Sequence, residues 1–272
     1  MDKRIEDDIP ETGIVVLHYI NKGLTNKCIK SILENTPQGM YHIYIVDNNS
    51  PEILRLDEDY PEVTIVRNDD RHSTNGMNKG FYHALYESQY KHKYIVNLDN
   101  DTEVHKGWLE PLVKEMEDHP KTGVCGGKQW KPDLKNYYSV GTDLTGFIYC
   151  NYPEKREEVN WIQGSFVMFR VEMMRMIGLH DTRFLDYCSD SDYCIHALDR
   201  GWDVVFVPES NITHLGGTSY KEFPIGIEGN EDLPQLISKW FGLKFNSFAN
   251  VVPINSMEKR FGKVTYKETR RE

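Results

Sequence analysis

Short apolar runs alternate with helical patterns through the first 120 residues of the chain. A run of about four to eight apolar residues between turn signals is typical of a strand buried on both faces. Runs of this kind, rich in β-branched residues, span residues 13–20, 42–46, 63–66 and 94–98. Strands that alternate with helices predict βαβ units, so we expect an α/β fold with a Rossmann-like, mainly parallel sheet flanked by helices.

The connecting helices are predicted from apolar residues at helical spacing. Thr25 is a favourable N-cap residue and predicts the start of the first helix, which Pro37 and Gly39 would end. A second helix is expected to begin near residues 75–78, and a third to span residues 108–116.

The pattern changes after residue 120, where short strand-like runs contain many glycines. The alternation is weaker there, which predicts a mixed sheet. Residues 172–178 and 190–200 have helical spacing, and the apolar run 203–208 predicts a late strand. His214 follows that strand in a turn-rich segment.

This change of pattern suggests how the chain is organised. We predict one domain over residues 1–220, with a nucleotide-binding half over about 12–120 and an acceptor half over about 121–220. Residues 221–272 form a C-terminal extension with a single predicted helix at 232–241 and a basic tail.

Composition and charge exclude several classes of protein. Apolar residues make up 39% of the chain, which is enough for a sizeable core. The net charge of −10 would repel a phosphate backbone, so we expect no nucleic-acid partner. The basic C-terminal stretch MEKRFGKVTYKETRRE is an exception: most such tails are solvated, but some dock on anionic membranes, which leaves peripheral membrane contact open.

The sequence also carries signals about its compartment. The 5 cysteines are scattered without a C-x-x-C pair, which argues against a zinc site or a disulfide framework. No run of about 18 apolar residues is present, and the charged start of the chain lacks the apolar centre of a signal peptide. We therefore expect a cytoplasmic protein.

Polar side chains follow each of the four predicted strands. In parallel sheets, ligands bind outside the carboxyl ends of the strands, and these ends meet at one edge. The sequence therefore predicts a binding site at this edge. The groups delivered there are His18 and Tyr19, Asp47 and Asn48, Asp69 to Arg71, and Asp99 to Asp101.

The carboxylates of Asp99 and Asp101 allow three interpretations. Either residue could cap the next helix or shape a turn. A calcium loop fits the spacing of acids, but Val104 stands where the loop requires glycine, and a strand precedes the segment. The third interpretation is a site for a hard cation that binds a phosphorylated substrate, because Mg²⁺ and Mn²⁺ are often held by one or two carboxylates and substrate phosphates.

A second acidic group lies at residues 186–192. Asp186, Asp190 and Asp192 crowd a short region before a predicted helix. If the helix begins near Asp190, the carboxylates of Asp190 and Asp192 lie in its first turn, where the helix dipole favours them. The two interpretations are helix capping and a general base directed at an acceptor hydroxyl.

Taken together, these motifs resemble family 2 glycosyltransferases with the GT-A fold, over about residues 12–220. The order and spacing of the motifs carry the resemblance. Within the family, the chain resembles a rhamnosyltransferase-like subgroup. The matching features are Tyr19 after the first strand, the D-N-x-S turn at 47–50, the N-x-G at 78–80, the DxD-type motif at 99–101, Gly164 and Gly178, the run from Phe184 to Gly201, and His214.

The sequence departs from the family pattern near the expected base. Ser189 stands where many members have glutamate, and His196 stands where they usually have arginine. The resemblance implies Asp190 as the base, with Asp192 as a fallback.

The resemblance implies an inverting transfer of a sugar from a nucleotide diphosphate sugar, of the UDP or dTDP type, to an acceptor hydroxyl. The acceptor would be a glycan, a lipid-linked sugar or another hydroxyl compound. The cofactor would be Mn²⁺ or Mg²⁺, with Asp101 and His214 as ligands and Asp99 bonded to the metal or to the ribose. Asp190 would take the proton of the attacking hydroxyl.

The resemblance also assigns substrate contacts. Tyr19 would stack on the base, Asp47 would accept the N3 hydrogen of uracil or thymine, and Arg71 would approach the diphosphate. Asn49 and Asn78 complete the expected nucleotide-binding residues. Candidates for stacking on an acceptor sugar are Trp130, Trp161 and Tyr187, each of which could equally be a packing residue.

Two other functions compete with this interpretation. A sugar-1-phosphate nucleotidyltransferase would also use an α/β sheet and acidic metal ligands, but it should carry a glycine-rich loop with Arg and Lys, whereas the first strand here is followed by HYINKGLTNK. A catalytically silent module that binds sugar nucleotides or glycans is the second, and Ser189 keeps that alternative open.

Overall fold

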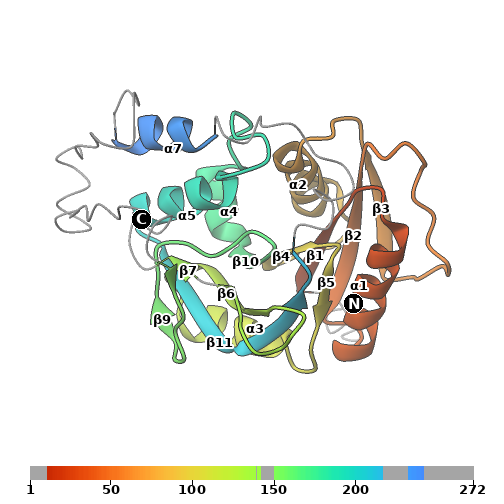
Figure 1. The fold of residues 1–272 in the computed structure, drawn as a ribbon, viewed down its shortest axis with the longest axis horizontal. Coiled ribbons are helices and arrows are strands. Elements are labelled where there is room, and N and C mark those ends of the chain that lie inside the picture. Colours follow the sequence, from red (N-terminus) through yellow and green to blue (C-terminus); the bar gives the residue numbers. More distant parts are fainter. Residues whose placement is uncertain (1–10, 139, 142–149, 217–231, 242–272) are drawn as a thin grey trace, which may run out of the picture.

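The computed structural model describes residues 11–138, 140–141, 150–216 and 232–241. Its main sheet has the strand order β3-β2-β1-β4-β10-β6-β11-β5, and β9 pairs with β11 (Figure 1). A separate pair is formed by β7 and β8. The strands are β1 Thr12–His18, β2 Tyr41–Asn48, β3 Val63–Asn68, β4 Tyr94–Asp99, β5 Thr102–Val104, β6 Thr122–Trp130, β7 Val140–Gly141, β8 Cys150–Asn151, β9 Glu157–Glu158, β10 Phe166–Arg170 and β11 Asp203–His214.

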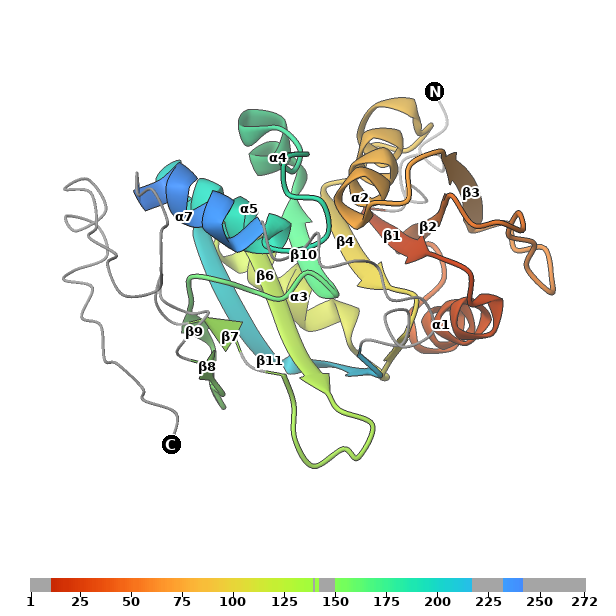
Figure 2. The same ribbon diagram turned by 45° about the horizontal axis from the view of Figure 1, so that its top comes forward.

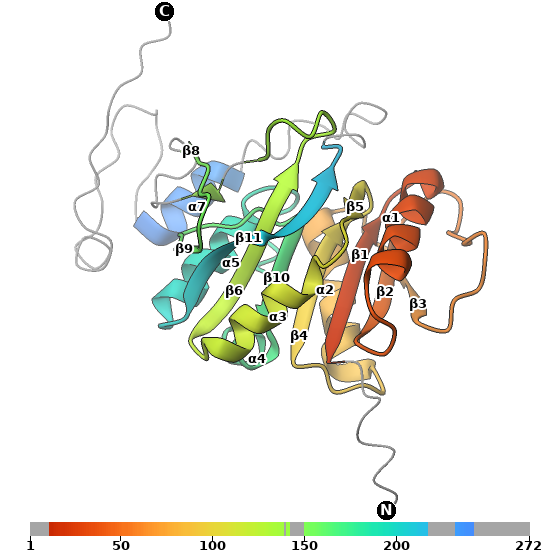
Figure 3. The same cartoon turned by 90° about the horizontal axis from the view of Figure 1, so that it is seen from below.

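Helices cover both faces of the main sheet. Side chains of α1 and α3 share one core cluster with the sheet, and α2, α4 and α5 contribute to the other. Figure 3 shows α1 and α3 over one face, and Figure 2 shows α2, α4 and α5 on the opposite side. The helices are α1 Lys22–Asn35, α2 Ser73–Tyr82, a π-helical turn His83–Glu87, α3 Leu109–Asp118, α4 Val171–Ile177, α5 Ser189–Asp199 and α7 Asp232–Phe241.

The sheet has a parallel part and a mixed part. β1 pairs in parallel with β2 and with β4, and β2 pairs in parallel with β3, which confirms the predicted parallel half. β10 runs antiparallel to β4 and β6, and β5 runs antiparallel to β11, so the second half is mixed as expected. The carboxyl ends of β1 to β4 therefore meet at one edge, where the predicted site should lie.

Helix α2 packs close against the parallel strands, and Gly80 makes this approach possible. A Cβ atom at Gly80 would lie 2.5 Å from Cγ1 of Val15 and 2.7 Å from Cγ2 of Val46. Contacts this short do not occur between real side chains, so the N-x-G motif at 78–80 has a packing reason for its glycine.

Three predicted boundaries are wrong, each for a local reason. The N-cap of α1 is Asn21, whose side-chain oxygen accepts from the Leu24 amide at 3.2 Å, and Thr25 lies inside the helix. Helix α2 begins at Ser73, ahead of the predicted 75–78. β11 continues past Pro208 to His214, because a register shift between Phe206 and Asn211 accommodates the proline.

The predicted C-terminal helix is confirmed. Helix α7 covers the predicted residues 232–241. Among the described residues, no helix combines the length and the apolar character needed to cross a membrane. The basic tail lies outside the described residues.

Candidate active site

The end of β4 and the end of β11 bring two carboxylates and one imidazole together. Asp99 ends β4, Asp101 follows in the turn to β5, and His214 pairs with Thr102 across the antiparallel β5 and β11. One ligand atom each of Asp99, Asp101 and His214 lies within 4.8 Å of the others. His214 thus reaches the site as the last residue of a strand, where the sequence had predicted a turn.

The carboxylates of Asp99 and Asp101 repel each other in this cluster. Burial, and then the charge of Asp101, raises the pKa of Asp99 to about 6. Burial lowers the pKa of His214, but the hydrogen bond to Asp101 and the two carboxylate charges outweigh it, so the pKa lies above its usual value. Nε2 of His214 is 3.2 Å from Oδ1 of Asp101. A divalent cation would relieve the repulsion between the carboxylates, and this donor set fits Mn²⁺ or Mg²⁺.

Two residues that the sequence did not point to orient the His214 ring. The Ser165 hydroxyl donates to Oε1 of Gln129 at 2.6 Å, so its oxygen is left to accept from Nδ1 of His214 at 3.3 Å. The Gln129 amide donates to the carbonyl of Gln163, which fixes its orientation. Without a cation, a protonated Nε2 of His214 donates to Asp101. In a neutral His214 with its proton on Nδ1, the lone pair of Nε2 would be available to a cation, as metal-binding histidines require.

Asn100 anchors the loop that carries the two carboxylates. Its amide donates to the Thr25 hydroxyl at 3.0 Å, and that hydroxyl lies 2.6 Å from Nδ1 of His18. Thr25, predicted as a helix cap, instead joins α1 to the ends of β1 and β4. The carboxylate loop is therefore fastened to two neighbouring elements.

Asp190 lies in the first turn of α5 and is tied to the carboxylate cluster through residues 164–165. The Gly164 amide donates to Oδ2 of Asp190 at 2.9 Å, and the Ser191 amide donates to Oδ1 at 2.7 Å. Burial raises the pKa of Asp190 against the opposing effect of these hydrogen bonds and of the neighbouring Trp161 side chain. The neighbouring Ser165 accepts from the Asp99 amide at 3.2 Å, so a single segment connects both groups.

Asp192, the fallback base, is engaged elsewhere. Its carboxylate is 2% exposed, Lys239 approaches it at 2.7 Å, and the Trp240 indole donates to it at 2.6 Å. Both partners belong to α7. Asp192 therefore fastens α7 to α5, and Asp190 is the carboxylate that lies with the cluster.

Asp47 is the second-to-last residue of β2, and Asn49 lies in the turn that follows it. The Asp47 carboxylate is buried and accepts from the amides of Ser50 and Leu54 and from Arg67 at 2.7 Å. These bonds lower the pKa of Asp47 although burial, the largest single effect, raises it. The Asn49 side chain accepts from Arg67 at 3.1 Å. The structure thus gives Asp47 a role in shaping this turn, and its contact with a nucleobase stays a prediction.

The other nucleotide-binding candidates lie on neighbouring elements. Tyr19 follows β1 and is half-buried, and Arg71 is exposed in the loop between β3 and α2. The Asn78 amide donates to the carbonyl of His180 at 2.8 Å and accepts from its N–H at 3.0 Å. Asn78 therefore joins α2 to the segment before α5, whereas Tyr19 and Arg71 lie at the predicted edge.

The three acceptor candidates separate into two groups. Trp130 donates to the Asn211 side chain at 2.8 Å, and its ring packs edge-on to Tyr137 at 5.5 Å between centroids. Trp161 contacts the carboxylate of Asp190, and Tyr187 lies just before α5 with 46% of its surface exposed. Trp161 thus lies beside the candidate base and Tyr187 three residues before it in the chain, and their contact with an acceptor stays a prediction.

Gly164 offers a direct test of this geometry. A Cβ atom there would lie 3.2 Å from Cβ of Asp190, tighter than nearly all real contacts. We expect Gly164→Ala to displace Asp190 by a few tenths of an ångström and to lower the sugar transfer that the family resemblance implies by up to roughly 10-fold, since a shift of about 1 Å in a reacting group costs about 100-fold. Mn²⁺ titration should give an unchanged affinity. Full activity in Gly164→Ala would show that the position of Asp190 is not critical.

Comparisons with known proteins relate part of this chain to glycosyltransferases. The family model for Glycosyl transferase family 2 matches residues 14–178. Polypeptide N-acetylgalactosaminyltransferase 11 of Xenopus tropicalis is 31% identical over 171 residues, which cover 58% of this chain and 26% of the relative. Glucosyl-dolichyl phosphate glucuronosyltransferase of Haloferax volcanii is 25% identical over 170 residues, 58% of this chain and 51% of the relative.

The fold is also found among solved structures. The crystal structure of GalNAc-T7 with UDP, GalNAc and Mn²⁺ superposes with a TM-score of 0.67 at 15% identity, covering 86% of this chain and 49% of that chain. This likeness shows the GT-A fold. The chain spans about half, or less, of the length of these relatives.

The family match argues against the nucleotidyltransferase alternative, and the rhamnosyltransferase-like subgroup stays a prediction. The matched segment is more than half of the 272 residues and includes β2 and β4, which contain Asp47 and Asp99. The chain therefore belongs to glycosyl transferase family 2.

Proposed function

We propose that this protein is an inverting glycosyltransferase that moves a sugar from a UDP- or dTDP-type nucleotide sugar to an acceptor hydroxyl. The observation that carries the proposal is the convergence of Asp99, Asp101 and His214 within 4.8 Å. Asp190 is joined to this cluster through residues 164–165. This arrangement supports a cation site with a neighbouring base, because it lies at the edge of the sheet where α/β proteins bind ligands.

Mn²⁺ or Mg²⁺ is the proposed cofactor. Asp101 and His214 would hold the ion, with Asp99 as a third ligand or bonded to the ribose. The bound ion would act as a Lewis acid that neutralises the charge on the departing diphosphate. The imidazole of His214 favours Mn²⁺ over Mg²⁺, because Mg²⁺ strongly prefers oxygen ligands.

Asp190 would act as the general base. The acceptor oxygen forms a bond to the anomeric carbon while the bond from that carbon to the diphosphate oxygen breaks. The electron pair of the broken bond stays with the diphosphate, and the hydroxyl proton moves to the Asp190 carboxylate. A single displacement of this kind inverts the anomeric carbon. The raised pKa of Asp190 suits this role, because a base is most effective when its pKa is near the working pH.

The donor would lie across the carboxyl ends of β1 to β4. Tyr19 and Arg71 come from the loops after β1 and β3, so an aromatic ring and a cation are available for the base and the diphosphate. The turn shaped by Asp47 lies between them in the sheet order. The acceptor would approach from the side of Trp161 and Tyr187, and a glycan or a lipid-linked sugar is the proposed class.

Thermal unfolding with a panel of nucleotide sugars tests the proposal. A ligand that binds only the folded state stabilises it by about 2.7 kcal/mol at a concentration of 100 times Kd. We expect UDP or dTDP sugars to raise Tm in the presence of Mn²⁺, and GDP sugars to leave it unchanged. Absence of any Mn²⁺-dependent shift would contradict the proposal. A shift without turnover of the donor in the presence of any acceptor would favour the silent binding module.

A further inference from the structure

Helix α7 follows the family-matched segment in the chain and contacts the loop that precedes Asp190. Figures 1 and 2 show α7 beside α5. Lys239 bonds to Asp181 at 2.9 Å, and the Gln235 amide donates to the Arg183 carbonyl at 2.7 Å. These contacts hold one end of the loop 181–187, and Asp232, the first residue of α7, holds the other.

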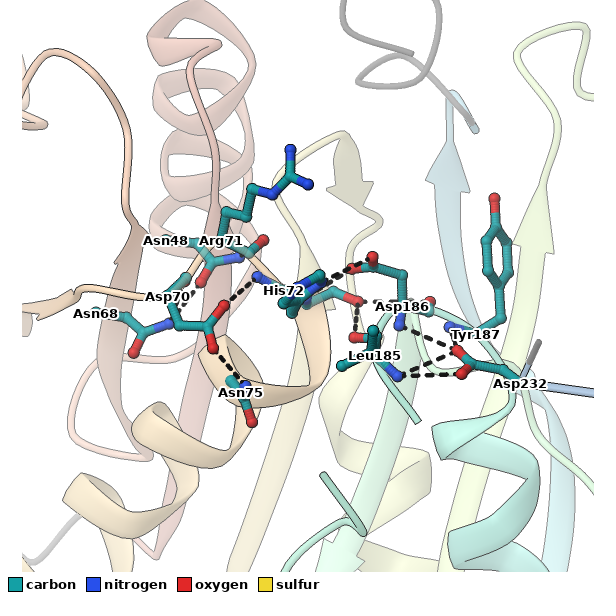
Figure 4. Close-up of polar contacts among 11 residues, drawn as sticks. Asn48, Asn68, Asp70, Arg71, His72, Asn75, Leu185, Asp186, Tyr187 and Asp232 are labelled. Carbon is teal, nitrogen blue, oxygen red and sulfur yellow. Dashed lines mark hydrogen bonds and ion pairs between the residues drawn. The ribbon is translucent and has the colours of Figure 1, made fainter. Parts of the chain in front are cut away.

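One carboxylate oxygen of Asp232 accepts hydrogen bonds from three consecutive backbone amides. Its Oδ2 accepts from the N–H groups of Leu185 at 3.1 Å, Asp186 at 3.2 Å and Tyr187 at 2.9 Å (Figure 4). Asp232 is only 2% exposed. Hydrogen bonds from N–H groups to a buried carboxylate are about twice as strong as neutral ones. The loop 185–187 is therefore fixed by a single charge that α7 supplies.

The same loop caps the start of α2. Oδ1 of Asp186 accepts from the Ser73 amide at 2.8 Å, and Oδ2 lies 3.2 Å from Nδ1 of His72. The Leu185 carbonyl accepts from the Thr74 amide at 3.1 Å. His72, the N-cap residue of α2, makes no side-chain capping bond. The amides of Ser73 and Thr74 have no acceptor within the first turn of α2, and they are bonded instead by residues more than 100 positions away in the chain.

The start of α2 is continuous with the loop that carries Arg71. The Arg71 carbonyl accepts from the Asn48 amide at 2.8 Å, and the Asp70 carboxylate accepts from the His72 N–H at 2.9 Å and from Asn75 at 2.6 Å. Figure 4 shows this run of contacts from Asn48 to Asp232. The loop 70–72 is held between β2 on one side and the Asp186 carboxylate on the other.

We propose that Asp232 is a positioning residue for the donor site. It fixes Asp186, which caps α2 and sets the position of Arg71, the residue proposed above to approach the diphosphate. The proposal rests on the proposed function. It makes the C-terminal helix part of donor binding, although this helix lies outside the segment that the family model matches.

Titration of UDP and of dTDP with Mn²⁺ into the full chain tests this role. We expect Asp232→Ala to weaken binding about tenfold, a typical coupling between two sites. Asp232→Asn keeps an oxygen acceptor and should stay within about threefold of the unsubstituted chain. Gln235→Ala is the matched control: it removes one hydrogen bond from the same helix to the same loop, at Arg183, and should leave the affinity unchanged.

A double-mutant cycle separates positioning from general loosening of α7. If Asp232 acts through Asp186, the effect of Asp232→Ala on Kd should largely vanish in an Asp186→Asn background. Hydrogen exchange at the Ser73 and Thr74 amides should become faster in Asp232→Ala, although Asp232 touches neither residue.

The outcomes distinguish the two proposals. Unchanged Kd in Asp232→Ala, or additive effects in the cycle, would overturn the role of Asp232 and leave the proposed function intact. Equal weakening by Gln235→Ala would also overturn it, because the effect would then belong to the docking of α7 as a whole. If the unsubstituted chain bound neither UDP nor dTDP, the proposed function would fail and this inference with it.

Discussion

Replacing Asp101 with asparagine should abolish the Mn²⁺-dependent stabilisation by nucleotides and lower sugar transfer about a thousandfold. A Lewis-acid cation contributes several kcal/mol to stabilising a charged transition state, and roughly 4 kcal/mol corresponds to a factor of a thousand in rate. Asp101 would supply a negatively charged ligand beside His214, at 3.2 Å from its Nε2. An amide keeps the shape of the carboxylate but offers a much weaker ligand.

The fold should survive this substitution. The backbone bond from the Leu215 amide to the Asp101 carbonyl at 3.1 Å is unaffected, and the repulsion between Asp101 and Asp99 is removed. The metal-free Tm should therefore stay within about 4 °C of the unsubstituted value, as for a change of about 1 kcal/mol or less. Glu103→Gln is the control, because Glu103 is a neighbouring acid in β5 that is exposed and lies outside the cluster. Retained Mn²⁺ dependence in Asp101→Asn would remove Asp101 from the proposed ligand set.

Local sequence patterns predicted the parallel half of the fold well. The apolar runs that became β1, β2 and β4 are buried, and α1 and α2 contribute to the two core clusters on opposite faces of these strands. The run 63–66 differs from the prediction, because β3 lies at the edge of the sheet and leaves Ile65 43% exposed. The convergence of polar strand ends was predictable from the same βαβ pattern. A hard-cation site was one of three interpretations of Asp99 and Asp101, and it arose because these residues follow a buried strand, so that reasoning needed no knowledge of distant residues.

What the sequence could not predict depends on contacts between distant segments. The nucleobase contact of Asp47 stays a prediction, but the sequence did not reveal that Arg67 of the neighbouring strand binds the Asp47 carboxylate. Asp192 was the fallback base, and the sequence did not reveal that Lys239 and Trp240 bind its carboxylate. Asp232 lies 47 residues from Leu185, and only the fold shows that they meet. Ser165 and Gln129 were missed because a hydroxyl and an amide that orient a histidine leave no spacing signal.

Asp190→Asn should lower sugar transfer by about 100- to 10,000-fold, the usual contribution of a general base, while nucleotide binding stays unchanged. The asparagine can still accept from the Gly164 amide, which lies 2.9 Å from Oδ2, so the first turn of α5 should keep its geometry. Because Asp190 touches only the acceptor in the proposed reaction, UDP or dTDP with Mn²⁺ should bind with the same Kd. A lower transfer rate together with an unchanged Kd for the nucleotide is expected of a general base and not of a structural residue.

The pH dependence gives a second test of the same residue. A base works only when it has lost its proton, so transfer should fall as the pH drops through the pKa of Asp190. Burial raises that pKa, so the acid limb of the rate profile should lie above the ordinary aspartate value of about 3.9. With Mn²⁺ kept at saturation, so that protonation of Asp99 and His214 does not remove the metal, the residual rate of Asp190→Asn should lack the limb. Asp192→Asn is the matched control in the same helical turn, since Asp192 binds Lys239 and Trp240. It should weaken the docking of α7 but keep the acid limb in place. A limb that disappears in Asp192→Asn and persists in Asp190→Asn would transfer the role of base to Asp192.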